Sequence, residues 1–559
     1  MKHLIRILCA AAAIAGVSCI ENDIPYPEVE IFINTMTGEG FTAASDASTR
    51  TVVLTLDEAT DIQHVKIIDA ALGVTPHATS LTAEELIPQV RTSQPLTGVF
   101  DLRTPLYTTL SLYQDYDWTI SARQQIERIF AVDGQVGATE IDPETRTVTA
   151  YVAKDADLSE VVVSSLKLGP SGITDYSPTL EELSGTSFQT VRFVDVTCHN
   201  RTERWMLYVK HTDKSVQLEG VYAWSKVIWL YGSGIQGVTS GFRYRAGEQS
   251  EWHEVENVTS DGGSFTAHLA AEPETQYTII AYCGSDETEP VSVTTDPVQA
   301  LANGSFEEWS TNNDVVYPYL EGAAPYWSTG NLGAKIANAT LTDKCDPRPG
   351  SSGRYGAYLK SQFANLVGLG KFAAGNLFLG HYVRNEGTNG VLTFGRPFAL
   401  RPTRLRIWAK YHQGIIDKLK SVPVGSDIKL GDPDNGHIYI ALGTWTAAEY
   451  GRDSKGNLVG TDDSPICVDT RDVATFFKHD SKDVIAYGEY VFDTDTDKAF
   501  PNSHQDGWVM MDIKLDYRVK NVAPTHMMIV CTASRWGDYF TGSTKSEMWV
   551  DDFELIYDE

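Results

Sequence analysis

A repeat near the start of the chain most constrains its fold. Residues 49–54 (TRTVVL) are matched by residues 145–150 (TRTVTA), and the alignment continues without a gap beyond them. Each copy spans roughly 90 to 100 residues, about the length of one β-sandwich, and consists of short β-branched runs between Gly, Pro, Asp and Ser turns. The repeat predicts two Ig-like β-sandwiches, over residues 31–124 and 125–213.

Each copy carries one tryptophan at a matching place. Trp118 is followed by Thr-Ile, and Trp205 is followed by Met-Leu. Large aromatic side chains at equivalent strand positions indicate core positions. We therefore expect Trp118 and Trp205 to fill the cores of the two sandwiches.

Residues 214–297 are similar to a fibronectin type III domain. Residues 241–245 alternate in polarity, and residues 273–277 lead into a second apolar strand. Tyr277 stands where such sandwiches have a corner tyrosine, whose hydroxyl satisfies backbone polar groups at a bend. None of the three modules contains a recognisable catalytic motif.

The first residues read as an export signal. A basic start is followed by an apolar stretch that is too short to span a bilayer, so residues 1–18 are expected to be a signal peptide. Small residues precede Cys19 in a lipobox-like order, which predicts lipidation of Cys19 and a tether over residues 19–30. The acidic run after Cys19 resembles the outward-export signal of Bacteroidota surface lipoproteins. We expect a protein that is anchored to the outer membrane, is exposed at the cell surface and contacts the membrane through its lipid only.

Composition narrows the classes of partner and metal. The formal net charge is −29, which argues against binding nucleic acid through a basic patch. The cysteines that follow Cys19 are odd in number and widely spaced, so neither a zinc site nor a disulfide framework is expected. They are Cys198, Cys283, Cys345, Cys467 and Cys531.

Residues 298–559, which we call the head, alternate clearly in two segments. In residues 405–412 and 508–517, every second side chain is apolar, which is typical of a sandwich with one buried and one wet face. Together with the repeats, this predicts an all-β chain: tandem Ig-like β-sandwiches followed by a C-terminal jelly-roll β-sandwich.

Short motifs along the head resemble one family, the putative carbohydrate metabolism domain, abbreviated PCMD. They are residues 303–307 (NGSFE), 327–331 (WSTGN), 375–380 (GNLFLG), 395–398 (GRPF), 536–542 (WGDYFTG) and 550–552 (VDD). The resemblance implies a glycan or polysaccharide ligand, in a surface lipoprotein of the Bacteroidota type that works beside polysaccharide-utilisation proteins.

Aromatic side chains could form a sugar platform, because the C–H face of a sugar ring stacks on them while polar neighbours bind its hydroxyls. The candidates lie on polar strand faces or in Gly-rich loops of the head. They are Trp327, Asn331, Trp408, Trp445, Tyr450, Trp508, Trp536 and Tyr539.

A structural calcium is a second expectation drawn from a resemblance. In similar jelly-roll modules, a Glu of the first strand and an Asp of the last strand meet over Ca²⁺. Glu307 and Asp552 occupy the matching places, and the backbone would have to supply further oxygens. No other cofactor is expected.

Two further functions stay open beside glycan binding. No serine-hydrolase elbow, zinc-protease or P-loop motif is present, and no catalytic residue is singled out. Glycoside hydrolysis, however, needs only two carboxylates, and Asp432, Asp434, Glu489 and Asp538 could face one cleft. A polysaccharide lyase would use the same head. The third possibility is an adhesin or structural surface protein, which would present an apolar patch instead of a groove.

Overall fold

The computed structural model describes residues 28–47, 49–77, 81–247, 251–366, 369–423 and 426–558. Each α-helix in these ranges spans four residues, whereas strands build every core, so the all-β prediction is confirmed. The expected signal peptide, Cys19 and most of the tether lie outside the described ranges. None of the described helices has the length and apolar character needed to cross a bilayer.

The chain divides into two compact units, Met1–Gln125 and Ile126–Glu559. The first unit holds two sheets that enclose one core. One sheet has the order β1-β4-β6, from β1 (Glu28–Gly38), β4 (Val65–His77) and β6 (Gly98–Phe100). The other has the order β2-β3-β8-β7-β5, from β2 (Phe41–Asp46), β3 (Thr51–Leu56), β8 (Asp115–Gln124), β7 (Leu106–Ser111) and β5 (Arg91–Thr92), with α2 (Ala83–Leu86) and η1 (Ile87–Gln89) between strands.

The second unit begins with the partner of this repeat. Its larger sheet has the order β10-β11-β15-β14-β13, from β10 (Glu140–Asp142), β11 (Thr147–Ala153), β15 (Arg201–Thr212), β14 (Arg192–Cys198) and β13 (Asp175–Ser177). The smaller sheet pairs β12 (Val163–Lys167) with β9 (Ile129–Val132), and α3 (Leu180–Leu183) lies before β14.

The two repeats share backbone geometry down to single residues. Arg50 and Arg146 both have a φ of 55°, and each carbonyl accepts an amide of a parallel strand: Thr119 at 3.0 Å and Met206 at 2.9 Å. These are the residues that follow Trp118 and Trp205. Both tryptophans are 1% exposed, so the prediction that they fill equivalent cores is confirmed.

A third sandwich follows, also from two sheets around one core. Tyr277 is buried and its hydroxyl accepts the amide of Glu272 at 2.9 Å, which confirms the corner tyrosine. The first sheet contains β16 (Val216–Ala223), β17 (Val227–Gly234), β21 (Ser264–Ala270) and β20 (Thr259–Asp261); the second contains β19 (His253–Glu254), β18 (Ser240–Ala246), β22 (Gln276–Cys283), β23 (Asp286–Glu287) and β24 (Val291–Thr294).

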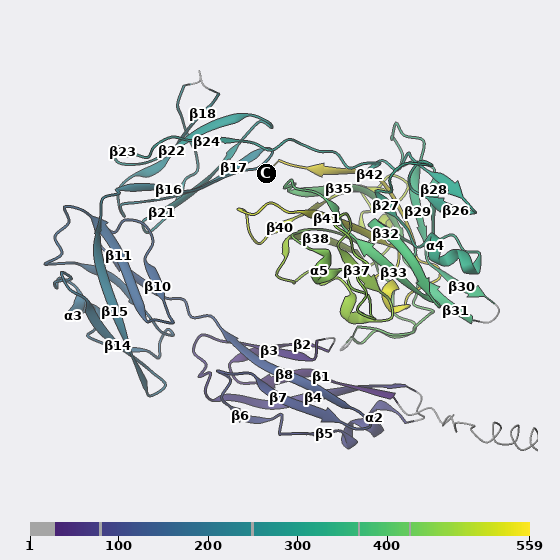
Figure 1. Ribbon diagram of the computed structural model, residues 1–559, viewed down its shortest axis with the longest axis horizontal. Coiled ribbons are helices and arrows are strands. Elements are labelled where there is room, and N and C mark those ends of the chain that lie inside the picture. The colour runs from purple at the N-terminus through teal and green to yellow at the C-terminus, as the bar shows by residue number, and fades with distance from the viewer. Residues whose placement is uncertain are drawn as a thin grey trace, which may run out of the picture. The chain divides into compact units, whose positions relative to one another are not determined.

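The head is built on two large sheets, whose strands run side by side in the green to yellow part of the ribbon (Figure 1). The nine-stranded sheet contains, in order, β37 (Ile466–Asp469), β33 (Asn389–Phe394), β32 (Asn376–Glu386), β41 (His526–Thr532), β36 (Gly436–Gly443), β38 (Val484–Phe492) and β40 (Asp516–Tyr517). Two short strands complete it: β27 (Trp327–Ser328), which pairs with β32, and β34 (Arg396–Pro397), which pairs with β41. The five-stranded sheet contains β28 (Thr342–Cys345), β29 (Gly356–Lys360), β42 (Glu547–Ile556), β35 (Arg404–His412) and β39 (Val509–Lys514).

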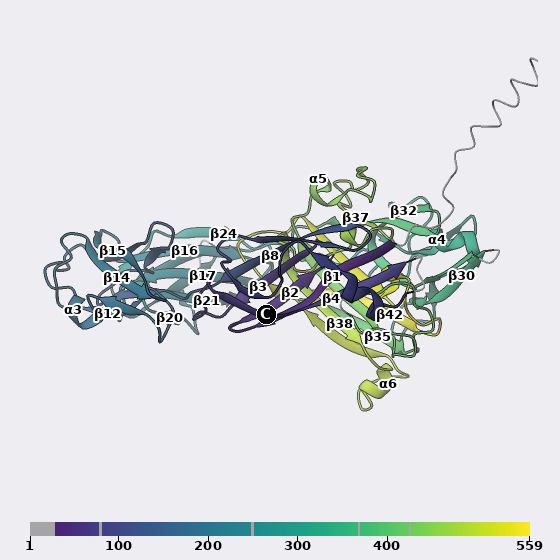
Figure 2. The ribbon, with the colours of Figure 1, turned by 90° about the horizontal axis from the view of Figure 1, so that it is seen from below.

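Small elements complete the head. They are the hairpins β25 (Ser310–Asn312) with β26 (Val315–Tyr317) and β30 (Gln362–Leu366) with β31 (Leu369–Ala373), and the helices α4 (Asn331–Ala334), η2 (Lys335–Ala337), α5 (Ala447–Tyr450), η3 (Val473–Thr475), α6 (Thr496–Ala499) and η4 (Gly537–Tyr539). In Figure 2, α5 and α6 mark opposite edges of the head.

The nine-stranded sheet carries a hydrophobic cluster on each face, in contrast to the five-stranded one. On β36, Ile438 and Ile440 point into the core between the two sheets, whereas Ala441 joins a second cluster on the outer face. The chain between β36 and β38 covers part of that outer face through Trp445, Phe476 and Phe477. The five-stranded sheet instead shows the expected alternation of buried and part-exposed residues along β35. The uncovered part of the outer face holds the candidate site.

Candidate functional site

A cavity of about 270 Å³ lies on the outer face of the nine-stranded sheet. Its floor is formed by β32, β33, β36 and β41, and its walls by α4, η2, the β30–β31 hairpin and the segment around η4. The volume is near the lower end of the range of about 300–1,000 Å³ found for small-molecule sites. The cavity therefore has room for a ligand of about the size of a sugar residue.

Aromatic rings supply much of the apolar lining. They come from the floor and from both walls: Phe372, Phe378, Tyr382, Phe394, Tyr439 and Phe540. The Tyr382 hydroxyl donates to Asn385, which also lines the cavity, and burial raises the pKa of Tyr382 to about 12. Rings beside amide and hydroxyl groups match the two kinds of surface that a sugar presents.

Lys371 of β31 brings a positive charge into the cavity wall. Its Nζ donates to Oδ1 of Asn389 at 2.7 Å and lies 3.6 Å from the centroid of the Phe540 ring. Partial burial, with the nearby charge of Lys420 as a second cause, lowers the pKa of Lys371 to about 8. Within the described residues Lys371 forms no ion pair with a carboxylate.

Asp538 of η4 lines the same cavity while its side chain is exposed to solvent, and desolvation by the surrounding residues raises the pKa of its carboxyl to about 6. In the part of the chain that the structure describes, the side chain forms no hydrogen bond or ion pair. A carboxyl whose pKa is shifted into the range near neutrality, inside a cavity, can hold or release a proton during a reaction.

His437 of β36 lines the floor and has a carboxylate behind it. Its Nε2 is 2.7 Å from Oε2 of Glu489 on β38, while the Tyr487 hydroxyl donates to the same oxygen at 2.9 Å. Burial lowers the pKa of His437, so the ring is neutral at pH 7 and donates Nε2–H to Glu489. These hydrogen bonds lower the pKa of Glu489 to about 2, which keeps it ionised.

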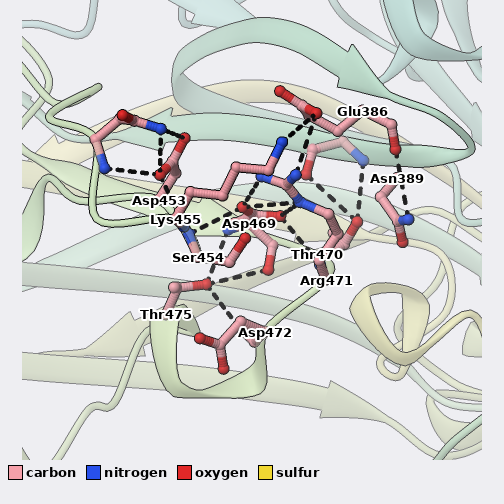
Figure 3. Close-up of polar contacts among 12 residues, drawn as sticks. Glu386, Asn389, Asp453, Ser454, Lys455, Asp469, Thr470, Arg471, Asp472 and Thr475 are labelled. Carbon is pink, nitrogen blue, oxygen red and sulfur yellow. Dashed lines mark hydrogen bonds and ion pairs between the residues drawn. The ribbon is translucent and has the colours of Figure 1, made fainter.

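A polar network fixes the rim of the cavity on the β32–β33 side (Figure 3). Arg471 donates to buried Asp469 through Nε at 2.9 Å and to Glu386 through Nη1 at 3.1 Å. Lys455 reaches the same Glu386 oxygen at 3.3 Å, and Oγ1 of Thr470 accepts the amide of Gly390 at 2.9 Å. The network ties the turn that carries Thr388 and Asn389 to the chain beyond β37, so it also positions the hydrogen-bond partner of Lys371.

None of the eight residues predicted as sugar ligands lines this cavity. Trp327, Trp445 and Trp508 are buried, and so is Asn331, whose amide binds the backbone of Val316 and Thr342. In this structure they offer no face to a ligand. Trp327 packs among aromatic rings of the head core, because its large ring seals the gap between the first and last segments of the domain.

The remaining four are part-exposed, and Trp536 and Tyr539 among them are in edge-to-face contact, with ring centroids 6.3 Å apart. Arg348 lies over the Trp408 ring at 4.4 Å, and the Tyr450 hydroxyl donates to Asp483 at 2.5 Å. Trp536 and Tyr539 stand closest to the cavity, since Gly537, Asp538 and Phe540 around them line it. The sequence motif of residues 536–542 thus lies beside this cavity, but the residues that line it are not the predicted Trp536 and Tyr539.

Of the four carboxylates that could have faced one cleft, two lie at the cavity and two do not. Asp538 lines the cavity and Glu489 contacts it through His437, whereas Asp434 is fully buried and accepts hydrogen bonds from Ser534 and Ser546. Asp432 accepts the amide of Lys429 in a loop.

Glu307 and Asp552 are each bound by other groups of the protein. The Glu307 carboxylate accepts the amides of Arg354 and Tyr355, and Asp552 pairs with Nε of Arg348 at 2.6 Å. The Arg348 guanidinium would have to move away from Asp552 before this carboxylate could bind a divalent cation. Among the described residues no group of three or more Asp, Glu, His or Cys side chains is placed to hold a metal. A structural calcium here stays an untested prediction.

Comparison with known proteins places the head in one family. The family described as "Putative carbohydrate metabolism domain" matches residues 305–556. No curated protein matches the chain.

Solved structures give more distant likenesses. One is described as a putative glycoside hydrolase from Bacteroides thetaiotaomicron (15% identity, 77% of this chain and 96% of that chain covered, TM-score 0.28). A second has the same description, from Bacteroides vulgatus (17% identity, 45% and 96% covered, TM-score 0.29). A third is a cellulose-specific carbohydrate-binding module, CBM28 (8% identity, 44% and 96% covered, TM-score 0.19). At these scores no function is carried over from them.

Proposed function

Residues 305–556 of this chain belong to the PCMD family, and on this basis we propose that the head binds glycans in the cavity on its nine-stranded sheet. The observation that carries the proposal is the lining of that cavity. Aromatic rings stand beside Asn385, Thr388, His437 and Asp538, which can exchange hydrogen bonds with hydroxyls.

Binding would combine stacking with polar contacts. Phe540 and Tyr439 offer ring surface from the wall and the floor, while Asn385 and Asp538 supply a donor and acceptors. The predicted platform of exposed tryptophans is replaced in this proposal by smaller rings inside a cavity. A site of this size suits one sugar residue of a longer chain.

The N-terminal features suggest where the head works. We propose that lipidated Cys19 anchors the protein in the outer membrane and that the three small sandwiches space the head from the cell surface. Supporting this are the lipobox-like order before Cys19, the acidic run after it and the net charge of −29, which favours a solvated exterior. Neighbouring polysaccharide-utilisation proteins would take up or cleave the bound glycan.

Asp538 favours a second candidate function, acid-catalysed cleavage of a glycosidic bond. Its pKa of about 6 would allow it to protonate a leaving oxygen, while Glu489, bound to His437, stays ionised. Two carboxyl groups with pKa values pushed apart are typical of glycoside hydrolases.

Affinity electrophoresis of the full chain, through native gels that contain neutral and acidic polysaccharides, tests the proposal. Product analysis of the same mixtures tests cleavage. We expect at least one polymer to retard the protein, and Thr388→Trp, at the exposed rim, to abolish the retardation. Thr311→Trp, an exposed head position away from the cavity, is the matched control.

The results of these experiments would distinguish the candidate functions. Retardation without products supports a binding protein, and products that vanish in Asp538→Asn support the hydrolase. Retardation that survives Thr388→Trp moves the site elsewhere. If no polymer retards the protein, glycan binding fails and the adhesin alternative gains.

A further inference from the structure

Positive charge gathers in and around the cavity of a strongly acidic protein. Lys371 and Arg535 line the cavity, and Lys420 is close enough for its charge to lower the pKa of Lys371. Among the described residues that line the cavity, Asp538 is the only one with a carboxylate. With a formal net charge of −29, a lining with more cations than carboxylates is unexpected from composition alone.

Both cavity cations keep hydrogen-bonding capacity to spare. An ammonium group has three N–H donors, and Lys371 uses one of them on Asn389. Arg535 has five donors, and within the described residues its guanidinium makes no hydrogen bond; its one ion-pair contact, to Oε2 of Glu489, is 3.8 Å long. These unused donors are what an anionic group requires.

Partial burial of Lys371 without a carboxylate partner also needs an explanation. Removing an ammonium from water is unfavourable unless an opposite charge compensates it, and the chain has 74 acidic residues that could have done so. Within the described residues the Phe540 ring and the Asn389 amide oxygen take that place. A site whose compensating charge arrives with the ligand accounts for this arrangement.

We propose that the cavity binds an anionic sugar residue, with its charged substituent held by Lys371 and Arg535. The inference rests on the proposed glycan binding and specifies the class of glycan: one that carries a carboxylate, as in a uronic acid, or a sulfate ester. The sugar ring packs against the aromatic lining of the cavity, and Asp538 accepts hydrogen bonds from hydroxyls of the sugar.

Matched polymers separate this inference from glycan binding in general. The full chain is run through gels that contain polygalacturonic acid or its carboxyl-reduced form, which differ only in the charged group. κ-Carrageenan and its desulfated form make the same comparison for sulfate. We expect retardation by at least one anionic polymer and little or none by its uncharged counterpart; which pair responds identifies the substituent. Because the protein itself is acidic, general charge attraction cannot produce that result.

Substitutions then assign the contact. Lys371→Met, which keeps the apolar stem, and Arg535→Met should each weaken affinity roughly tenfold to a hundredfold, because hydrogen bonds between charged groups are lost. Lys371→Arg should retain most of it. Lys514→Met on β39, in the other sheet, is the control and should bind as the parent does.

Several outcomes would overturn the inference. Equal retardation by charged and uncharged polymers, or by uncharged ones alone, leaves glycan binding standing but removes the anionic class. Unchanged affinity in Lys371→Met and Arg535→Met, with melting temperatures like the parent, moves the charge contact elsewhere. Retardation by none of the polymers overturns this inference together with the proposed function.

Discussion

The ammonium group of Lys371 lies 3.6 Å from the centroid of the Phe540 ring, with a hairpin on one side of the contact and the end of η4 on the other. The attraction between a cation and the face of a ring joins two walls of the cavity. It also holds Lys371 at the cavity surface, so the position of its charge depends on both segments.

Affinity for an anionic polymer should fall as pH rises above about 8. Lys371 carries its charge below a pKa of about 8 and loses it above, and a bound anion raises that pKa. One proton then gives a fall of about tenfold between pH 7 and pH 9. Affinity electrophoresis at several pH values measures this.

Lys371→Arg provides the control, because a guanidinium does not titrate in this range and the fall should disappear. The other charged groups around Lys371 do not explain such a fall. Asp538 titrates near pH 6, His437 below its usual range and Tyr439 well above pH 10, while Lys420 and Arg535 are cations. An identical fall in Lys371→Arg would contradict the prediction.

Replacing Asp538 by Asn should stabilise the protein slightly at pH 7. Desolvation raises the pKa of Asp538 in the folded state above its unfolded value of about 4. The ionised carboxylate therefore disfavours folding, and this penalty grows as pH rises through the folded pKa of about 6. Below about pH 4 the group is protonated in both states and the penalty is absent. Solvent reaches the group and screens it, so the gain in melting temperature at pH 7 should be about 1–2 °C. The variant should match the parent at pH 4, and calorimetry at the two pH values checks both points.

Arg471→Met should loosen the chain between β36 and β38. The substitution leaves the buried carboxylate of Asp469 without its guanidinium, and loss of one partner of a buried pair is strongly destabilising. Limited proteolysis within residues 444–483 should be roughly tenfold faster or more. Binding should weaken as well, because Asn389 and Thr388 lose their support.

Lys455→Met is a matched control for Arg471, since it removes an exposed partner of the same Glu386. An exposed ion pair contributes little, so cleavage should change by about twofold or less. Equal effects of the two substitutions would show that the network does not hold this segment.

Trp118→Ala and Trp205→Ala should each destabilise their own sandwich by about 3–5 kcal/mol, because a large cavity opens in the core. Replacing either tryptophan by Phe should lower the free energy of unfolding clearly less than Ala does, because the indole N–H groups have no hydrogen-bond partner in the described structure. Calorimetry of the full chain would show one shifted transition per variant. Similar losses for Phe and Ala would contradict the equivalence of packing.

The repeated sandwiches could be predicted because their signal is local and periodic. The match of Trp118 with Trp205 sets the register of two parallel strand pairs that the structure then shows. The two repeats share a further local signal: Thr82 and Thr179 each begin a short helix with a capping box, and both helices end on a buried leucine.

The site was harder to predict, because burial depends on pairing between distant strands. A tryptophan beside glycine indicates neither an exposed ring nor a buried one, and Trp327 and Trp445 turned out to be buried. The near-continuous apolar run of residues 526–532 is typical of a strand that is covered on both faces. It is therefore a sequence signal for a layer outside the nine-stranded sheet. Lys371 had no such signal, since only the fold brings it to Phe540.

The contrast between an acidic exterior and the cations of the cavity also bears on kinetics. A polyanion approaching a protein of formal net charge −29 is repelled at long range and attracted only on entering the site. Dissolved salt weakens the long-range repulsion first, since its screening length is about 10 Å at 0.1 M. Capture of an anionic chain would therefore quicken with salt before it weakens, so that association is fastest at an intermediate ionic strength.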